Sequence, residues 1–198
     1  MRRTGRLIAV VGPSGVGKDS VMAAIAQAVP EVRVVRRIIA GAPSVVDRGE
    51  PYTATSASEF SRMVAQGGFA LHWDAHGLRY GIPVSVHGAL AEGRDCLANL
   101  SRGVLGQGQA VFATMQVLHI TARPDTLARR MAARGRDTAT QMRSRLARAN
   151  TPLPDGVETC EISNDGPLHD TVAQAVARLS LAGDDTALTP RGCHDTAC

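Results

Sequence analysis

The stretch Gly12-Pro13-Ser14-Gly15-Val16-Gly17-Lys18 decides the fold of this chain. Its spacing, G-x-x-x-x-G-K, is typical of a loop whose glycines turn backbone N–H groups towards phosphate oxygens while the lysine reaches the outer phosphates. Lys18 is the only lysine among 22 lysines and arginines. A compact ammonium therefore stands where the wider, planar fork of an arginine would not fit. The stretch predicts a phosphate-binding loop and the binding of a nucleoside triphosphate.

The residues on both sides of this loop provide the context that such a motif requires. Residues 6–11 form an apolar run typical of a short buried strand. Residues 20–29 carry Val21, Ile25 and Val29 on one face of a helix, and Pro30 ends that helix. The order of strand, glycine-rich loop and helix disfavours a chance glycine-rich turn.

The rest of the chain alternates segments typical of strands with segments typical of helices. Such alternation produces a parallel sheet with helices on both faces. We therefore expect an α/β fold of the P-loop NTPase class, in one domain over residues 1–182 with a core of 1–35 and 84–182. The further strands expected in the core are 32–35, 95–100, 116–120 and 158–162, and the helices are 84–92, 102–109, 124–133 and 169–181.

Residues 36–83 interrupt this alternation and predict a small insertion. We expect loops and short hairpins at 40–58. A helix should begin at Ser56, with Glu59 three residues later, and two paired strands should follow at 69–73 and 78–83. We expect Phe60 and Phe69 to pack inside the insertion, because large rings bury much area in a small unit. Five of the six aromatic residues lie here: Tyr52, Phe60, Phe69, Trp73 and Tyr80.

The composition limits the classes of function. Charged residues make up 20% of the 198 residues and hydrophobic residues 44%, as in ordinary soluble proteins, and no apolar run approaches the roughly 20 residues of a membrane span. The four cysteines include no C-x-x-C pair, which indicates reduced thiols. The short apolar stretch after the first arginines runs directly into the phosphate loop and would be destroyed by cleavage as a signal peptide, so we expect a cytoplasmic protein. For the polar segment 183–198 we expect disorder rather than a metal site at Cys193, His194 and Cys198.

The net charge of +4 comes from arginines in small groups, not from a basic stripe interleaved with aromatic residues. This distribution argues against a nucleic-acid partner and favours a small anionic substrate. A homodimer is left open.

The arginine-rich segment after residue 127 predicts a mobile cap over the phosphates. Two helical patterns are broken at Arg134-Gly135-Arg136, so residues 134–148 are expected to form a lid. Arg134, Arg136 and Arg145 would then neutralise the charge of a transferring phosphoryl group and help to exclude water. The alternative is a solvated basic face.

The sequence contains no His-Arg-Asp-like loop and no evident base placed to take a proton from a hydroxyl. A phosphate acceptor would need none, because its oxygens are largely ionised at pH 7. Transfer from phosphate to phosphate is therefore favoured over phosphorylation of an alcohol.

From Leu7 to about Leu181 the chain resembles guanylate kinases, and more specifically the ribose 1,5-bisphosphate phosphokinases of phosphonate breakdown. That family is similar in a Gly-Lys-Asp-Ser loop end, an Arg-Arg segment, a Trp-x-Ala-x-Gly-Leu-x-Tyr-Gly run, an Asn-x-Ser-Arg strand end and an Asn-Asp-Gly turn. Here these are Gly17–Ser20, Arg36-Arg37, Trp73–Gly81, Asn99–Arg102 and Asn164–Gly166. The resemblance implies that ATP and ribose 1,5-bisphosphate give ADP and 5-phosphoribosyl 1-diphosphate (PRPP).

The motif and the resemblance together assign the site residues. Gly12, Pro13, Ser14, Gly15, Val16, Gly17 and Lys18 are expected to bind ATP, with Asn164 on the adenine side. Asp19 stands where most phosphate loops have Ser or Thr, so Asp19 and Ser20 are expected to hold Mg²⁺. Arg36, Arg37, Arg48, Tyr80, Asn99 and Ser101 are expected to bind the acceptor. Tyr80 and Trp73 could equally serve packing.

The chain departs from the family at Ala40-Gly41, where the family usually has Thr-Arg to grip the acceptor phosphate. Arg48, Arg36 or Arg37 could replace that arginine.

Two rival functions stay open. A guanylate-type nucleoside monophosphate kinase is disfavoured by the neutral Asn99 and Ser101, where guanylate kinases carry carboxylates. A catalytically silent nucleotide-binding module on the same fold is disfavoured by Lys18 and Asp19.

Overall fold

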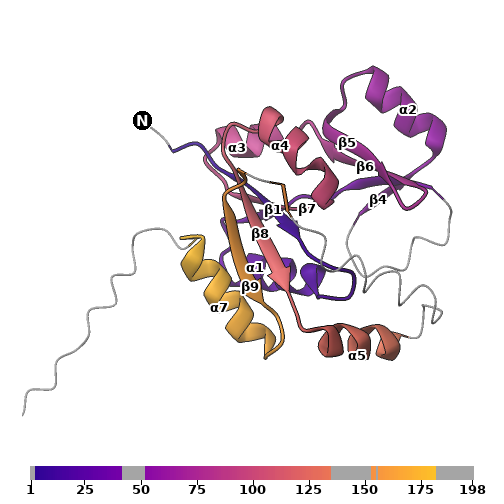
Figure 1. The fold of residues 1–198 in the computed structure, drawn as a ribbon. Coiled ribbons are helices and arrows are strands. Elements are labelled where there is room, and N and C mark those ends of the chain that lie inside the picture. Colours follow the sequence, from indigo (N-terminus) through magenta and orange to yellow (C-terminus); the bar gives the residue numbers. More distant parts are fainter. Residues whose placement is uncertain (1–2, 42–51, 135–152, 155, 182–198) are drawn as a thin grey trace, which may run out of the picture.

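The computed structural model describes residues 3–41, 52–134, 153–154 and 156–181 (Figure 1). Most of the expected lid, residues 134–148, and the whole of the segment 183–198 lie outside the described residues, as does Arg48. Arg134 is described only as the last residue of a helix.

Five strands form a parallel sheet, which we call the core sheet. Its order is β2-β7-β1-β8-β9, and each neighbouring pair runs parallel. The prediction of a parallel sheet is confirmed, with strand bounds close to those expected. The strands are β1 (Leu7–Val11), β2 (Arg33–Val34), β7 (Cys96–Asn99), β8 (Met115–Thr121) and β9 (Thr159–Ser163).

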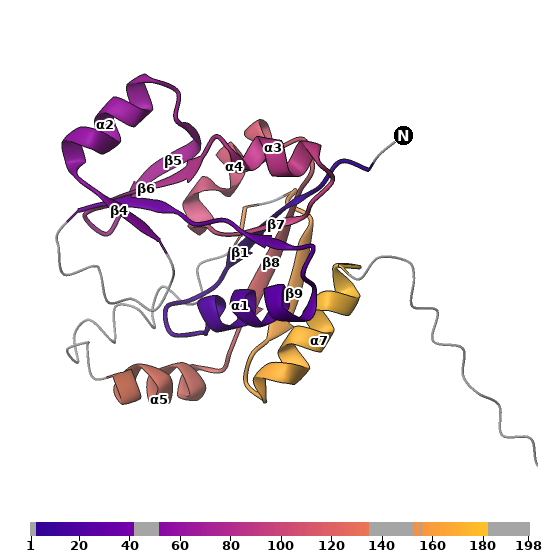
Figure 2. The ribbon, with the colours of Figure 1, turned by 180° about the vertical axis from the view of Figure 1, so that it is seen from behind.

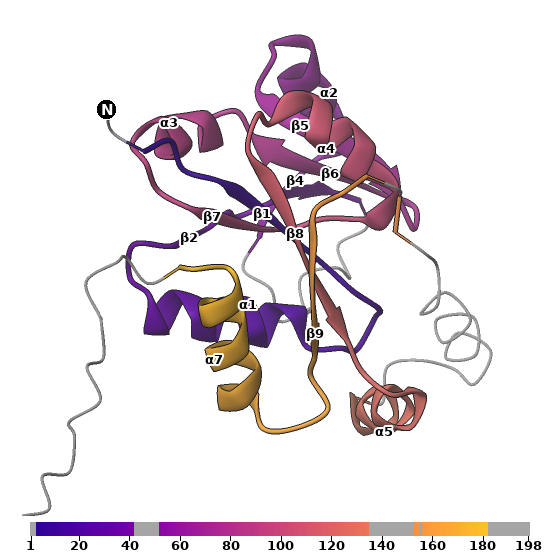
Figure 3. The same ribbon diagram turned by 60° about the vertical axis from the view of Figure 1, so that its left-hand side comes forward.

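Both faces of the core sheet are covered, as predicted. Alternate residues of β1 point to opposite faces: Ile8 and Val10 pack in the cluster under α1 and α7, whereas Leu7, Ala9 and Val11 pack under α3 and α4. Figure 3 shows the two pairs of helices on opposite sides of the strands. Because all five residues of β1 are buried, this strand is the rigid base of the loop that follows it. The helices are α1 (Lys18–Ala28), α3 (Val86–Ala91), α4 (Leu105–Val111) and α7 (Leu168–Arg178).

A second sheet, which we call the side sheet, forms the predicted insertion. Its order is β4-β3-β6-β5, with the predicted pair β5 (Phe69–Ala75) and β6 (Leu78–Pro83) running antiparallel. The prediction of hairpins between residues 40 and 58 is wrong for the two strands that the structure describes at either end of this segment. β3 (Ile38–Ala40) and β4 (Thr53–Thr55) pair in parallel, and two parallel strands cannot be joined by a hairpin turn.

The helix α2 (Ala57–Ala65) covers one face of the side sheet and begins as predicted, because the Ser56 hydroxyl accepts the Glu59 N–H at 3.1 Å. Phe60 is fully buried and stacks on Phe69 at 4.5 Å between ring centroids, which confirms their packing role. Gly81 makes this possible, because a Cβ there would collide with the Phe69 ring. The opposite face of the sheet carries Trp73 and joins the core under α3 and α4.

Two further helical segments complete the described fold: the 3₁₀ turn η2 (Arg102–Val104) after β7, and α5 (Pro124–Arg134) after β8. Figure 2 shows the loop between β1 and α1 lying between the side sheet and α5. None of the helices in the described ranges is long and apolar enough to cross a membrane.

Candidate active site

The loop between β1 and α1 has the backbone that its glycines were expected to allow. Gly15 has φ +85° and Gly17 has φ +95°, values of the left-handed region that favours glycine. A Cβ at Gly17 would also come within 2.8 Å of Nδ2 of Asn164. Helix α1 begins directly after Gly17, so the positive end of its dipole faces the loop. The arrangement is that of an anion-binding loop.

Lys18 is folded against the inside of this loop. Its Nζ donates to the carbonyl oxygens of Gly12 at 3.0 Å and Pro13 at 3.2 Å. The ammonium is thereby held beside the backbone N–H groups that the glycines turn inward. One cation and several backbone donors are concentrated at a point where phosphate oxygens can be received.

The side chain of Asn164 supports the phosphate loop by a hydrogen bond to its backbone. It is 4% exposed, its Nδ2 donates to the carbonyl of Val16 at 2.7 Å, and its Oδ1 accepts the Thr171 hydroxyl at 2.9 Å. The sequence predicted Asn164 on the adenine side of the nucleotide site, and the structure shows that both ends of its side-chain amide are bonded within the protein. Its contribution to the nucleotide site is to tie the loop to β9 and α7.

Arg130 is a functional candidate that the sequence placed only within a basic helix. Its Nη1 donates to the carbonyl of Val16 at 3.2 Å, and its neighbour Met131 lies under Gly15. Helix α5 therefore brings an arginine to the loop one turn before the expected lid. Arg136 and Arg145 lie outside the described residues, and of Arg134 only its place in the helix is described.

The start of α5 is fixed by Asp165, which follows Asn164 in the predicted Asn-Asp-Gly turn. Its carboxylate accepts the Arg123 N–H at 2.9 Å and the Ser163 hydroxyl at 2.7 Å. Burial raises its pKa, but these hydrogen bonds, one from Thr126 and the charge of Arg123 together lower the pKa to about 2. The carboxylate is therefore ionised at neutral pH and fastens α5 to the end of β9.

Asp19 and Asn99 meet across the gap between α1 and the end of β7. The Asn99 Nδ2 donates to Oδ1 of Asp19 at 3.1 Å, and Asn99 is 7% exposed. Ser20, the other expected metal ligand, is exposed to solvent. The carboxylate of Asp19, a hard oxygen ligand beside the phosphate loop, has the chemistry that Mg²⁺ prefers.

On the acceptor side, the structure separates the two arginines of the Arg-Arg segment. The Arg37 guanidinium lies over the Tyr80 ring at 5.0 Å from its centroid, and Tyr80 stacks on Trp73 at 5.4 Å. Arg36 is exposed. Tyr80 and Trp73, which the sequence left between packing and substrate contact, are both buried and hold Arg37 in place.

Gly41, at which the resemblance led us to expect arginine, lies against the side chain of Leu78. A Cβ at position 41 would collide with the side chain of Leu78, which is 6% exposed. The space in which a side chain at 41 would begin is therefore filled by Leu78. Ser101 is half-buried, and its carbonyl accepts the Val104 N–H at 3.2 Å, so its backbone starts the turn η2.

Arg102 follows Ser101, and its pKa is lowered by burial. The charge of Arg102 affects the pKa of His119 on β8. Burial and Arg102 lower the pKa of His119, although its Nδ1 is 3.1 Å from the carboxylate of Glu161. His119 is therefore neutral at pH 7, and Arg102 is the cation at this point. The sequence indicated Arg102 only as part of the Asn-x-Ser-Arg strand end.

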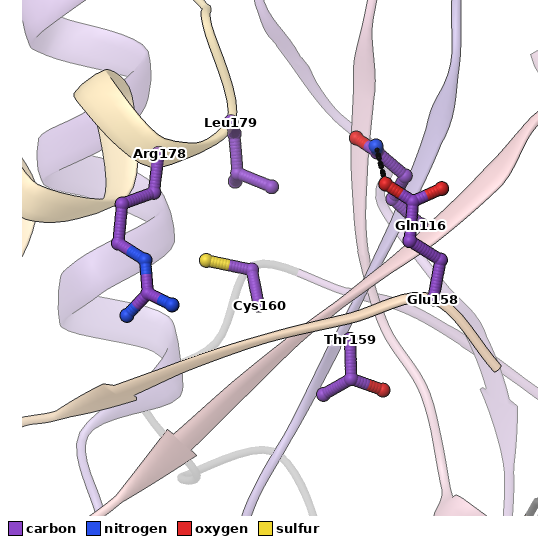
Figure 4. A pocket seen from close by; sticks show the side chains of 6 residues that line it. All are labelled: Gln116, Glu158, Thr159, Cys160, Arg178 and Leu179. Atoms are coloured by element: carbon purple, nitrogen blue, oxygen red, sulfur yellow. Dashed lines mark hydrogen bonds between the residues drawn. The ribbon is translucent and has the colours of Figure 1, made fainter.

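A separate pocket of about 180 Å³ lies at the amino ends of β8 and β9 (Figure 4). It is formed where β8 and β9 begin and α7 ends, whereas the phosphate loop follows the carboxyl end of β1. Its position excludes it from the nucleotide site. It is lined by Gln116, Glu158, Thr159, Cys160, Arg178 and Leu179.

Comparison with known proteins places this geometry in a family. The chain is 48% identical over 174 residues to a ribose 1,5-bisphosphate phosphokinase PhnN of Ruegeria sp. (strain TM1040), covering 87% of this chain and 90% of the relative. The chain belongs to the family of ribose 1,5-bisphosphate phosphokinases. A second member, from Azotobacter vinelandii, is 40% identical over 178 residues, covering 88% of this chain and 95% of the relative.

The fold agrees with the predicted guanylate-kinase-like architecture. A guanylate kinase from Anaplasma phagocytophilum superposes with a TM-score of 0.63 over 92% of this chain and 89% of that one, at 13% sequence identity. At this identity the likeness extends to the fold alone. No family model matches the sequence.

Proposed function

We propose that this protein transfers the γ-phosphoryl group of ATP to the 1-phosphate of ribose 1,5-bisphosphate, producing PRPP and ADP. The observation that carries this proposal is the phosphate loop with Lys18 folded inside it, in a chain 48% identical to a ribose 1,5-bisphosphate phosphokinase. The family and the predicted reduced thiols support a place in cytoplasmic phosphonate breakdown.

In this reaction an oxygen of the acceptor 1-phosphate attacks the γ-phosphorus, and the bond to the ADP oxygen breaks. No side chain needs to remove a proton, because the attacking oxygen is already ionised at neutral pH. The work of the protein is positioning and charge neutralisation. The loop glycines and Lys18 hold the phosphates, Arg130 adds a cation from α5, and Arg134, Arg136 and Arg145 are proposed for the lid.

Magnesium, when bound with the nucleotide, would neutralise part of the phosphate charge. Asp19 is the residue proposed to hold it, because it offers a carboxylate directly after Lys18. Ser20 is a weaker candidate since its side chain faces solvent.

For the acceptor we propose that Arg37 takes over the phosphate grip that the family usually builds at position 41. The Tyr80 ring, itself stacked on Trp73, holds the guanidinium in one place. A pre-positioned guanidinium loses less freedom when it binds phosphate than an arginine free in solvent, such as Arg36. Arg48, Asn99 and Ser101 are the further candidates predicted from the sequence.

Phosphorus NMR tests the proposal directly. The protein is incubated with Mg-ATP and ribose 1,5-bisphosphate, with GMP as acceptor in a parallel tube and Lys18→Met as the inactive control. A new diphosphate signal in the first tube supports the proposed reaction. A product only with GMP would make the protein a nucleoside monophosphate kinase, and no product in either tube, with ATP still bound, would favour the silent binding module.

A further inference from the structure

The contact between Asp19 and Asn99 links the phosphate loop to the neighbouring strand. Asp19 is the second residue of α1, and Asn99 is the last residue of β7, paired in register with Val10 of β1. The two side chains are 80 residues apart in sequence and 3.1 Å apart in space. We propose that Asn99 is a positioning residue that orients the carboxylate of Asp19 for the divalent cation of the bound nucleotide. This inference rests on the proposed use of a metal–nucleotide complex.

A carboxylate at this position needs orientation more than the usual hydroxyl does. An aspartate has one more rotatable bond than a serine and two equivalent oxygens, and its charge adds repulsion against the nucleotide phosphates when it points wrongly. One hydrogen bond from Asn99 occupies Oδ1 and restricts the rotation of the carboxylate, which leaves Oδ2 for a cation.

Asn99 is suited to this task by its own rigidity. It is 7% exposed on a strand buried along its whole length, next to β1, which carries the phosphate loop. A donor on such a strand holds its partner within a few tenths of an ångström, as second-layer residues of metal sites do. Its amide is also neutral, whereas a carboxylate at position 99 would repel Asp19.

This assignment differs from the one that the sequence suggested, in which Asn99 binds the acceptor. The two roles predict different measurements. A residue that orients Asp19 affects the affinity for the cation when no acceptor is present. A residue that binds the acceptor affects the KM for ribose 1,5-bisphosphate and leaves the cation affinity unchanged.

The experiment uses the full chain with ADP and Mn²⁺, without any acceptor, and follows unbound Mn²⁺ by electron paramagnetic resonance. We expect Asn99→Ala to weaken Mn²⁺ binding to the protein–ADP complex roughly tenfold or more, as loss of an orienting partner does in other metal sites. The affinity for ADP in the presence of EDTA, measured by calorimetry, should stay unchanged. Asn99→Leu, which fills the buried space without a donor, should behave as Asn99→Ala does.

A change at position 19 supplies the matched control. In an Asp19→Ser background, which restores the hydroxyl of ordinary phosphate loops, Asn99→Ala should no longer alter Mn²⁺ affinity. Unchanged Mn²⁺ affinity in both single Asn99 variants, or an equal loss in the Asp19→Ser background, would overturn the proposal. Because the titration contains no acceptor, its result is independent of whether the proposed phosphoryl transfer is found.

Discussion

The two sheets of this protein carry their proposed binding groups in different ways. The core sheet supports a loop whose glycines and backbone groups are proposed to bind phosphate, and the buried side chain of Asn164 holds this loop. The side sheet instead presents side chains, with Arg37 carried on the stacked rings of Tyr80 and Trp73. A site made of backbone depends on its loop conformation, whereas a site made of side chains can exchange one cation for another. If Arg37 grips the acceptor phosphate as proposed, this difference accounts for Gly41 at the position where the resemblance led us to expect arginine.

The strongest test of the core-sheet site is Lys18. Lys18→Met should lower kcat by roughly 10³-fold or more, because the cation that faces the transferring phosphoryl group is removed. Lys18→Arg keeps the charge but should also lose most activity, since a guanidinium is too wide for the bonds to Gly12 and Pro13. ADP release measures activity, and thermal unfolding checks the fold. A Lys18→Arg variant with near-normal turnover would show that charge alone suffices.

A second test compares a buried ion pair of the core sheet with an exposed one of the side sheet. Asp95 is 6% exposed and accepts hydrogen bonds from Arg3 and Arg6, whereas Asp74, paired with Arg79, is 81% exposed. Asp95→Ala should lower the free energy of unfolding by about 3 kcal/mol, because the largely buried guanidinium of Arg6 loses its only carboxylate among the described residues, and the Arg6 N–H loses its acceptor. Asp74→Ala should change it little. Urea unfolding measures both.

The same ion pair predicts a pH dependence. Burial raises the pKa of Asp95, but the hydrogen bonds and charges of Arg6 and Arg3 hold it below its ordinary value of 3.8. Its contribution to stability is therefore complete above about pH 4 and is lost as the pH falls through the lower folded pKa. The stability difference between the wild type and Asp95→Ala should shrink as the pH falls from about 4 through the folded pKa of Asp95. A difference that grows with acidity would contradict the assigned charge state.

A third test asks whether the side sheet binds through Arg37. Arg37→Ala should raise the KM for ribose 1,5-bisphosphate by about tenfold while the KM for ATP stays unchanged, as expected for loss of one phosphate contact. Tyr80→Leu removes the ring under Arg37 and should raise the same KM severalfold. Arg36→Ala is the matched control and should have a smaller effect. Equal effects at 36 and 37 would remove the reason to single out the stacked arginine.

The smallest expected effect concerns Gly41. Gly41→Ala should cost about 1 kcal/mol of stability, because the added Cβ collides with the buried side chain of Leu78. In a Leu78→Ala background the collision is removed, so the same substitution should cost less, and the backbone strain of φ +157° at position 41 remains. Two additive losses in thermal or urea unfolding would show that position 41 is not limited by Leu78.

The parts that could be predicted are those encoded by neighbouring residues. The glycine spacing around Lys18 sets the loop, the apolar run of β1 sets a buried strand, and Ser56 with Glu59 sets the start of α2. These features follow from backbone freedom and side-chain periodicity within about ten residues. Their predictions agree with the described structure to within a few residues.

The parts that could not be predicted depend on contacts between distant residues. Asn164 and Arg130 reach the carbonyl of Val16 across 148 and 114 residues, and Asn99 reaches Asp19 across 80. The parallel pairing of β3 with β4 was likewise not predicted, because the local sequence pattern favours hairpins. Sequence alone therefore determined that a phosphate loop exists and which fold carries it, because a local motif defines the loop. Only the tertiary structure decided which side chains hold that loop, orient Asp19 and present Arg37, because those choices depend on how the strands are ordered in the two sheets.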